Sequence, residues 1–320
     1  AVGDAAADSG DAEEEEANIL EGGAGFFASC SPLVQYEVKA GGQIHLDLVQ
    51  AYARLGYASY RLVPGRDLLV PFRPDGPIDR YLLNLFACKP DRAAQLARDG
   101  WLIDALPEPQ APDDLPPGLS DHALDWRATL APLPYGKTLS GLWERTVAAD
   151  DIGAVEEALA LYALSRDASR SVDQRFLALD CSFRRFSRLA EASPSHPHLA
   201  SLARVAREYG AREIAVKALF ELCNSMSQAG HADLEVPFLA PGKRFETVDP
   251  EGACGEWLLA AAGEELEKLQ AYSSFYTGTA AQSRLEAICR NRFAGPEMHR
   301  RLELLQHRFD LPASAGVTQE

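Results

Sequence analysis

The sequence predicts an α/β domain followed by an all-α domain. Residues 11–103 alternate short β-rich runs with helical patterns, whereas from residue 120 onward apolar residues recur with a helical period and no strand pattern follows. A proline-rich stretch, residues 104–119, lies between the two and has the composition of a linker. The first ten residues are small and acidic, without periodicity, and we expect them to be disordered.

The helices and strands of the first domain are predicted from its hydrophobic patterns and from the turn residues between them. Strand-like runs alternate with amphipathic helical patterns, which predicts βαβ units and a parallel sheet. The turn Pro64-Gly65 between two β-rich runs predicts a hairpin, whose two strands are antiparallel. In chain order we expect a helix over 17–27, a strand over 33–38, a helix over 43–55, strands over 59–63, 68–72 and 81–88, and a helix over 91–98.

The second domain is a series of helices joined by short turns, most of them marked by glycine or proline. Such paired helices predict a stack of helical hairpins. The stretch 196–229 has the length and layout of a tetratricopeptide unit, and a generic helical hairpin is the alternative. The expected helices are 139–149, 152–165, 172–192, 199–209, 212–227, 255–275, 280–292 and 297–309.

Charge and hydropathy exclude some classes of partner. The chain has 47 acidic and 31 basic residues, a net charge of −16, which disfavours binding to nucleic acids and to anionic membrane surfaces. No apolar run approaches the ~20 residues of a membrane span, and the acidic beginning does not resemble a signal peptide. The six cysteines include no C-x-x-C pair, so we expect buried, reduced thiols in a cytoplasmic protein.

Three carboxylates are candidate catalytic residues. Asp11 and Glu13 open an acidic cluster that has two readings: the solvated first turn of a helix, or the carboxyl end of a strand facing a cleft. Glu37 lies near the end of the strand predicted at 33–38, where α/β sheets bind ligands.

Residues 11–90 resemble the carboxyl half of FkbM-type S-adenosylmethionine-dependent methyltransferases. The matching text comprises Asp11-Ala12-Glu13-Glu14, Ala17-Asn18-Ile19-Leu20-Glu21-Gly22, Pro32-Leu33-Val34-Gln35-Tyr36-Glu37-Val38, Gly56-Tyr57-Ala58-Ser59-Tyr60-Arg61 and Asn84-Leu85-Phe86-Ala87. These motifs keep the order and spacing of the family over about eighty residues, a quarter of the chain.

The resemblance implies a partial Rossmann-like class I methyltransferase sheet and methyl transfer from S-adenosylmethionine, most simply to an oxygen of a small molecule or sugar. Asp11 and Glu13 would border the methyl-transfer site and Glu37 the same cleft. Glu14 stands where the family has glycine, and only ten residues precede Asp11, too few for a βαβ unit of about 30 residues. We therefore expect an incomplete enzyme, whose cofactor-binding half is missing.

Other motifs carry weaker signals. Gly41-Gly42 follows a predicted strand and precedes a helix, so it could face the cleft or simply form a tight turn. His196 and His198 could be a pair of metal ligands, or could form a turn before a helix.

Two functions therefore remain open. The first is an FkbM-type methyltransferase with a helical carboxyl-terminal domain. The second is a non-catalytic scaffold, in which the helical domain binds a protein partner and the α/β part supports it.

We predict that the 320-residue chain self-associates, because missing sheet strands would leave an exposed edge and an apolar face. Light scattering at micromolar concentration measures this directly. A monodisperse monomer would contradict the prediction.

Overall fold

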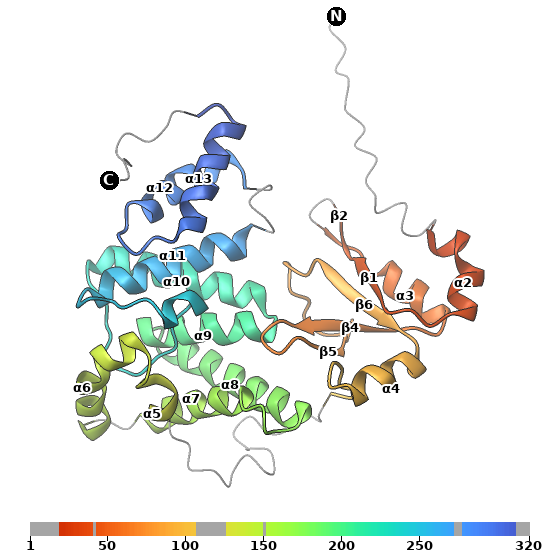
Figure 1. The fold of residues 1–320 in the computed structure, drawn as a ribbon, viewed down its shortest axis with the longest axis horizontal. Helices are drawn as coiled ribbons and strands as arrows, with labels where there is room; N and C mark the ends of the chain where they lie inside the picture. The colour runs from red at the N-terminus through yellow and green to blue at the C-terminus, as the bar shows by residue number, and fades with distance from the viewer. Residues whose placement is uncertain (1–18, 41–42, 107–125, 150–151, 272–276, 312–320) are drawn as a thin grey trace, which may run out of the picture. The chain divides into compact units, whose positions relative to one another are not determined.

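The computed structural model describes residues 19–40, 43–106, 126–149, 152–271 and 277–311. The chain separates into two compact units, Ala1–Pro109 and Gln110–Glu320. The division falls within the proline-rich stretch, and the first unit contains the strands while the second is helical (Figure 1). The coarse prediction of an α/β part followed by an α-helical part is confirmed.

The main sheet of the first unit has the strand order β1-β6-β4-β5. Every neighbouring pair in it is antiparallel. The parallel pairing expected from the alternation of strands and helices is therefore wrong for neighbouring strands, because the last strand, β6, lies between β1 and β4. The strands are β1 (Val34–Glu37), β4 (Ala58–Val63), β5 (Leu68–Pro71) and β6 (Asn84–Cys88).

Strands β1 and β4 run in the same direction, since each is antiparallel to β6. The helix α3 (Asp47–Arg54) lies between them in the chain, so they form a βαβ unit whose two strands are separated by an inserted third. The helix begins later than predicted because a two-stranded ladder, β2 (Lys39–Ala40) with β3 (Gln43–Ile44), precedes it. The predicted hairpin is confirmed as β4 and β5, joined between Val63 and Leu68.

Helices cover both faces of this sheet. Along β6, Leu85 and Ala87 belong to one apolar core, with residues of α3 and the helical segment 19–29. Phe86 and Cys88 belong to a second core with α4 (Pro90–Arg98). This alternation follows from the two-residue period of a strand, and it makes β6 the shared centre of both layers.

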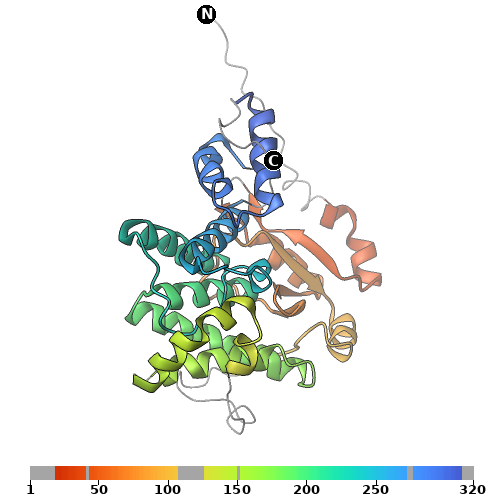
Figure 2. The same cartoon turned by 60° about the vertical axis from the view of Figure 1, so that its left-hand side comes forward.

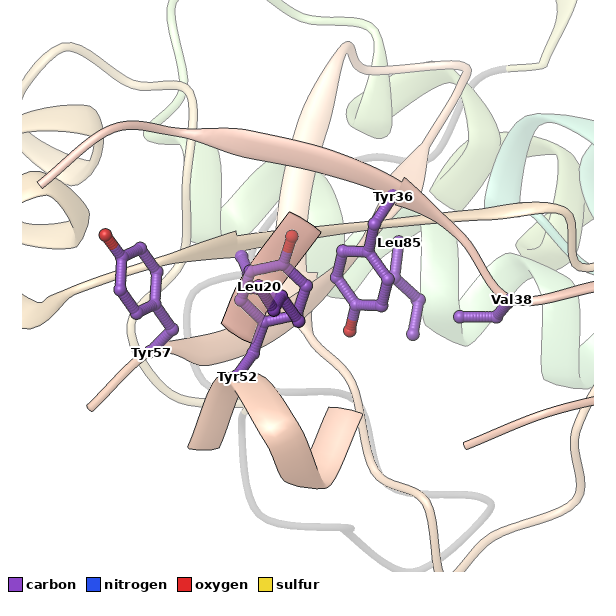
Figure 3. Close-up of a cluster of buried hydrophobic side chains, with 7 residues drawn as sticks. Leu20, Tyr36, Val38, Tyr52, Tyr57 and Leu85 are labelled. Carbon is purple, nitrogen blue, oxygen red and sulfur yellow. The ribbon is translucent and has the colours of Figure 1, made fainter. Parts of the chain in front are cut away.

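Tyrosine rings form the centre of the first core (Figure 3). The ring centroids of Tyr36 and Tyr52 lie 4.6 Å apart, and those of Tyr52 and Tyr57 lie 5.9 Å apart. The hydroxyl of Tyr57 donates to the carbonyl of Cys30 at 3.0 Å, and the hydroxyls of Tyr36 and Ser59 are 2.7 Å apart. These bonds satisfy the polar ends of the rings, which a buried tyrosine requires.

The second unit is a stack of helices in which each helix from α7 to α13 packs against the next (Figure 2). Helical periods predicted most of these elements to within a few residues. The hairpin at 196–229 is present as two helices joined through Gly210, which adopts a left-handed conformation. The helices are α5 (Arg127–Leu130), α6 (Pro134–Ala149), α7 (Gly153–Ser165), α8 (Val172–Ala192), α9 (His196–Tyr209), α10 (Arg212–Ala229), α11 (Cys254–Gln270), α12 (Gln282–Cys289) and α13 (Pro296–Arg308).

A connection without long helices, residues 230–253, is held against this stack by side-chain hydrogen bonds to its backbone; we call it the strap. The Ser201 hydroxyl accepts from the amide of Leu239 at 3.0 Å, and the Trp143 indole donates to the carbonyl of Leu234 at 3.0 Å. Phe238 of the strap is fully buried. The middle of the strap, residues 237–242, is therefore part of the core.

Arg204 of α9 is the buried charge that ties the strap to the helices. Its side chain is 1% exposed, and it contacts Glu208 of its own helix and Glu246 of the strap, each within 3 Å. It also donates to the carbonyl of Ala240. A guanidinium can leave water in this way only when its donors are paired.

We predict that Arg204→Ala lowers the free energy of unfolding by about 3 kcal/mol, because it removes the buried guanidinium that Glu208, Glu246 and the carbonyl of Ala240 share. Tyr162 and Arg166 still contact the two carboxylates, which keeps the loss at the lower end for a buried pair. Urea denaturation measures the change. Lys217→Ala is the control, since the exposed Lys217–Glu213 pair on α10 should contribute less than about 0.5 kcal/mol. Equal effects of the two substitutions would contradict the prediction.

Candidate functional site

The sheet topology brings several loops of the first unit to one edge. Strands β1 and β4 end there and β6 begins there, because β6 runs opposite to both. In open α/β sheets, ligands bind outside the carboxyl ends of the strands that run in a common direction. The segments that meet at this edge are the β2–β3 ladder, the turn 64–67 and the end of the loop 72–83 that precedes β6. We call it the strand-end edge.

Of the three predicted site residues, only Glu37 lies within the part of the chain that the structure describes. It is the last residue of β1, half-buried, and pairs in register with Asn84, the first residue of β6. Since side chains alternate along a strand, Glu37 and Asn84 lie on the sheet face opposite Tyr36 and Leu85. The carboxylate of Glu37 thus lies at the strand-end edge, as the sequence indicated. Asp11 and Glu13 lie outside the described residues, as do Gly41 and Gly42.

A cationic and aromatic group lies at the same edge. The ammonium of Lys39 is 5.7 Å from the centre of the Tyr81 ring, and the guanidinium of Arg80 is 5.1 Å from it. Lys39 also donates to the carbonyl of Arg80 at 2.7 Å, and the Asp79 carboxylate accepts from the amide of Tyr81 at 2.8 Å. Sequence analysis did not identify this group.

The two histidines, for which a metal pair and a turn before a helix were both considered, make structural contacts at the start of α9. The Nδ1 atom of the buried His196 accepts from the amide of Asp233 at 2.8 Å, which holds the strap. The Nδ1 atom of His198 lies 2.8 Å from the carbonyl of Ser193, just before α9. Across the described ranges, no group of three or more His, Cys, Asp or Glu side chains is placed to hold a metal ion.

The cysteines are free thiols, as predicted. Burial raises the pKa of the Cys88 thiol to about 11 and that of the Cys223 thiol to about 12. These two thiols therefore stay protonated near neutral pH, which makes them poor nucleophiles. Cys88 is a small buried core residue, as the sequence predicted, whereas Cys223 is half-buried.

The helical unit offers a different kind of surface. Its strap occupies part of the helical stack, so the polar side chains of α9 that face the strap are already engaged. On α10, by contrast, Ile214 is 37% exposed and Phe220 is 55% exposed. Apolar side chains exposed in this way are typical of protein contacts, though single ones are also common on monomer surfaces.

Comparisons of this chain with protein-family models, with curated proteins and with solved structures found no match. Within the part of the chain that the structure describes, no helix has both the length and the apolar character needed to cross a membrane.

We predict that the stability of the protein falls between pH 7 and pH 5 in part through His196. Burial lowers the pKa of His196 below its ordinary value, an effect that the Asp233 carboxylate partly opposes. The unfolded chain therefore takes up the proton first as the pH falls through about 6.5, and the free energy of unfolding decreases.

Urea denaturation at several pH values tests this, with His196→Asn as the comparison. The Asn carbonyl oxygen can accept from the Asp233 amide but does not titrate. The variant should show a shallower pH dependence. Identical pH profiles for the two proteins would show that His196 contributes nothing to the effect.

Proposed function

We propose that the first unit is the carboxyl-terminal part of an FkbM-type methyltransferase domain, which transfers a methyl group from S-adenosylmethionine to a small molecule or sugar, and that it forms the acceptor side of the site. The observation that carries the proposal is the order β1-β6-β4, with α3 linking two strands of common direction. Two strands of common direction joined through a helix are the repeating unit of doubly wound folds, and many such sheets also carry an antiparallel strand.

Helices on both faces of the sheet add to this support, since doubly wound sheets are covered in the same way. The position of Glu37 adds more, because a residue at the end of β1 borders the crevice where such folds bind ligands. The motifs of the resemblance fall on these elements in the expected order: Pro32 to Val38 on β1, Gly56 to Arg61 on β4, and Asn84 to Ala87 on β6.

The described residues do not fit the cofactor itself. Within them, no glycine-rich loop joins a strand end to a helix in the way that holds S-adenosylmethionine in this fold class. The cofactor supplies a methyl group that is already activated. This chain's contribution is then to hold the acceptor, with Glu37 removing its proton or orienting it, and cytoplasmic small molecules and sugars are the acceptors we propose.

A second candidate is a non-catalytic scaffold that binds a protein partner. The exposed Ile214 and Phe220 on α10 favour it, as does the stacking of consecutive helices. The two candidates differ in whether the chain binds S-adenosylmethionine. They also differ in whether a change at Glu37 or a change at Phe220 abolishes function.

If this chain transfers methyl groups by itself, calorimetric titration will show micromolar binding of S-adenosylmethionine despite the missing glycine-rich loop, and S-adenosylhomocysteine will form with a panel of sugars and small hydroxyl compounds. Glu37→Gln should lower the turnover rate by about 100-fold or more, the usual contribution of a general base.

Glu221→Gln, a change of the same kind at an exposed position on α10, is the control and should leave the rate unchanged. Absence of both cofactor binding and product would contradict the proposal for this chain. A Phe220→Ala variant that lost a partner, while Glu37→Gln kept it, would then favour the scaffold.

A further inference from the structure

Two cations are held over one tyrosine ring at the strand-end edge. The Lys39 ammonium lies 5.7 Å and the Arg80 guanidinium 5.1 Å from the centre of the Tyr81 ring. Lys39 comes from β2 and the other two residues from the loop before β6, so the sheet topology brings them together across 41 residues of sequence. Arg80 is exposed, and Lys39 and Tyr81 are half-buried.

Bringing two like charges together costs energy, and specific contacts offset the cost. The negative face of an aromatic ring attracts a cation within about 6 Å. The carbonyl of Arg80 accepts one of the three ammonium protons of Lys39 at 2.7 Å. The loop is fixed in turn, because the carboxylate of Asp79 accepts from the amide of Tyr81.

These two positive side chains lie in a protein whose net charge is strongly negative. The chain has a net charge of −16, so its average field repels anions. An anion would approach the strand-end edge only if local cations attracted it. Lys39 supplies an ammonium, and Arg80 supplies a planar guanidinium that suits the two oxygens of a carboxylate or phosphate.

We propose that Lys39 and Arg80 bind an anionic group, a phosphate or carboxylate, on the acceptor molecule. Lys39 follows Glu37 by two residues and opens β2, so both residues lie at the strand-end edge. The anion anchors one end of the acceptor, and the rest of the acceptor extends toward Glu37. The acceptor is thus an acidic or phosphorylated small molecule or sugar, an assignment that rests on the proposed methyltransferase function.

The carboxylates near the cations restrict what can bind. Glu37 and Asp79 belong to the same edge and repel a second negative group. We therefore expect one anionic group per ligand. A nucleic acid, with a charge at every nucleotide, does not suit such a site.

Calorimetric titration of the full chain tests the proposal with inorganic phosphate, glucose 6-phosphate, glucuronate and glucose, at low salt and without S-adenosylmethionine. We expect saturable binding of the anionic probes and none of glucose. In Lys39→Gln/Arg80→Gln the affinity for the anionic probes should fall at least tenfold, whereas in Lys39→Arg it should stay within about threefold, because both charges and the Arg80 guanidinium remain.

Arg54→Gln/Arg98→Gln is the matched control. It removes the same number of charges from exposed positions on α3 and α4, and the affinity should change less than twofold. An equal loss in both glutamine variants would show an effect of net charge alone and would overturn the proposal. So would the absence of saturable anion binding.

The single variant Arg80→Gln covers the case in which the double variant does not fold. Arg80 is exposed, so its replacement should leave the thermal unfolding temperature unchanged while weakening anion binding about threefold or more. Unchanged anion binding in this variant would overturn the proposal.

The outcome is separable from that of the methyltransferase test, because no cofactor is present. Anion binding without S-adenosylmethionine binding would retain the anion site and reject methyl transfer by this chain. Cofactor binding without anion binding would retain the methyltransferase and reject an anionic acceptor.

Discussion

The insertion of β6 between β1 and β4 is the constraint on which the first unit depends. Strand β1 pairs in the sheet with β6 alone, and the β4–β5 hairpin is joined to β1 only through β6. The same five residues, Asn84–Cys88, supply side chains to the cores on both faces. Because β6 runs opposite to its neighbours, it also brings the ends of β1 and β4 to its own beginning, which creates the strand-end edge.

The second unit is held together by a different device, in which helix side chains bind the backbone of the strap. A buried connection without regular structure leaves amides and carbonyls in need of partners. Tyr135, Ser201 and Arg204 provide them, each from a different position on α6 and α9. This self-recognition covers part of the helical stack with the protein's own residues. A partner protein would therefore have to use another face, such as the one that carries Phe220.

Local sequence patterns predicted the helices and the hairpin of this fold. They did not predict the order of the strands in the sheet. The period of apolar residues located α8 to the residue and most other helices to within a few residues, because helical bonds connect residues four positions apart. The hairpin β4–β5 followed from Pro64-Gly65 for the same local reason. The antiparallel insertion of β6 was not predicted, since a strand's sequence shows which of its faces are buried but not which strand lies beside it.

The residues of the candidate site also fall into those that local sequence could identify and those that it could not. Glu37 could be identified because its position at the end of a strand can be read from nearby residues. Lys39 and Arg80 could not, because their proximity depends on the order of the strands. Lys39 follows Glu37 by only two residues in the chain, so the two side chains can act on one small ligand. In the methyltransferase proposed above, such an anchor would let binding energy set the orientation of the acceptor, which is the main task that an activated methyl donor leaves to the protein.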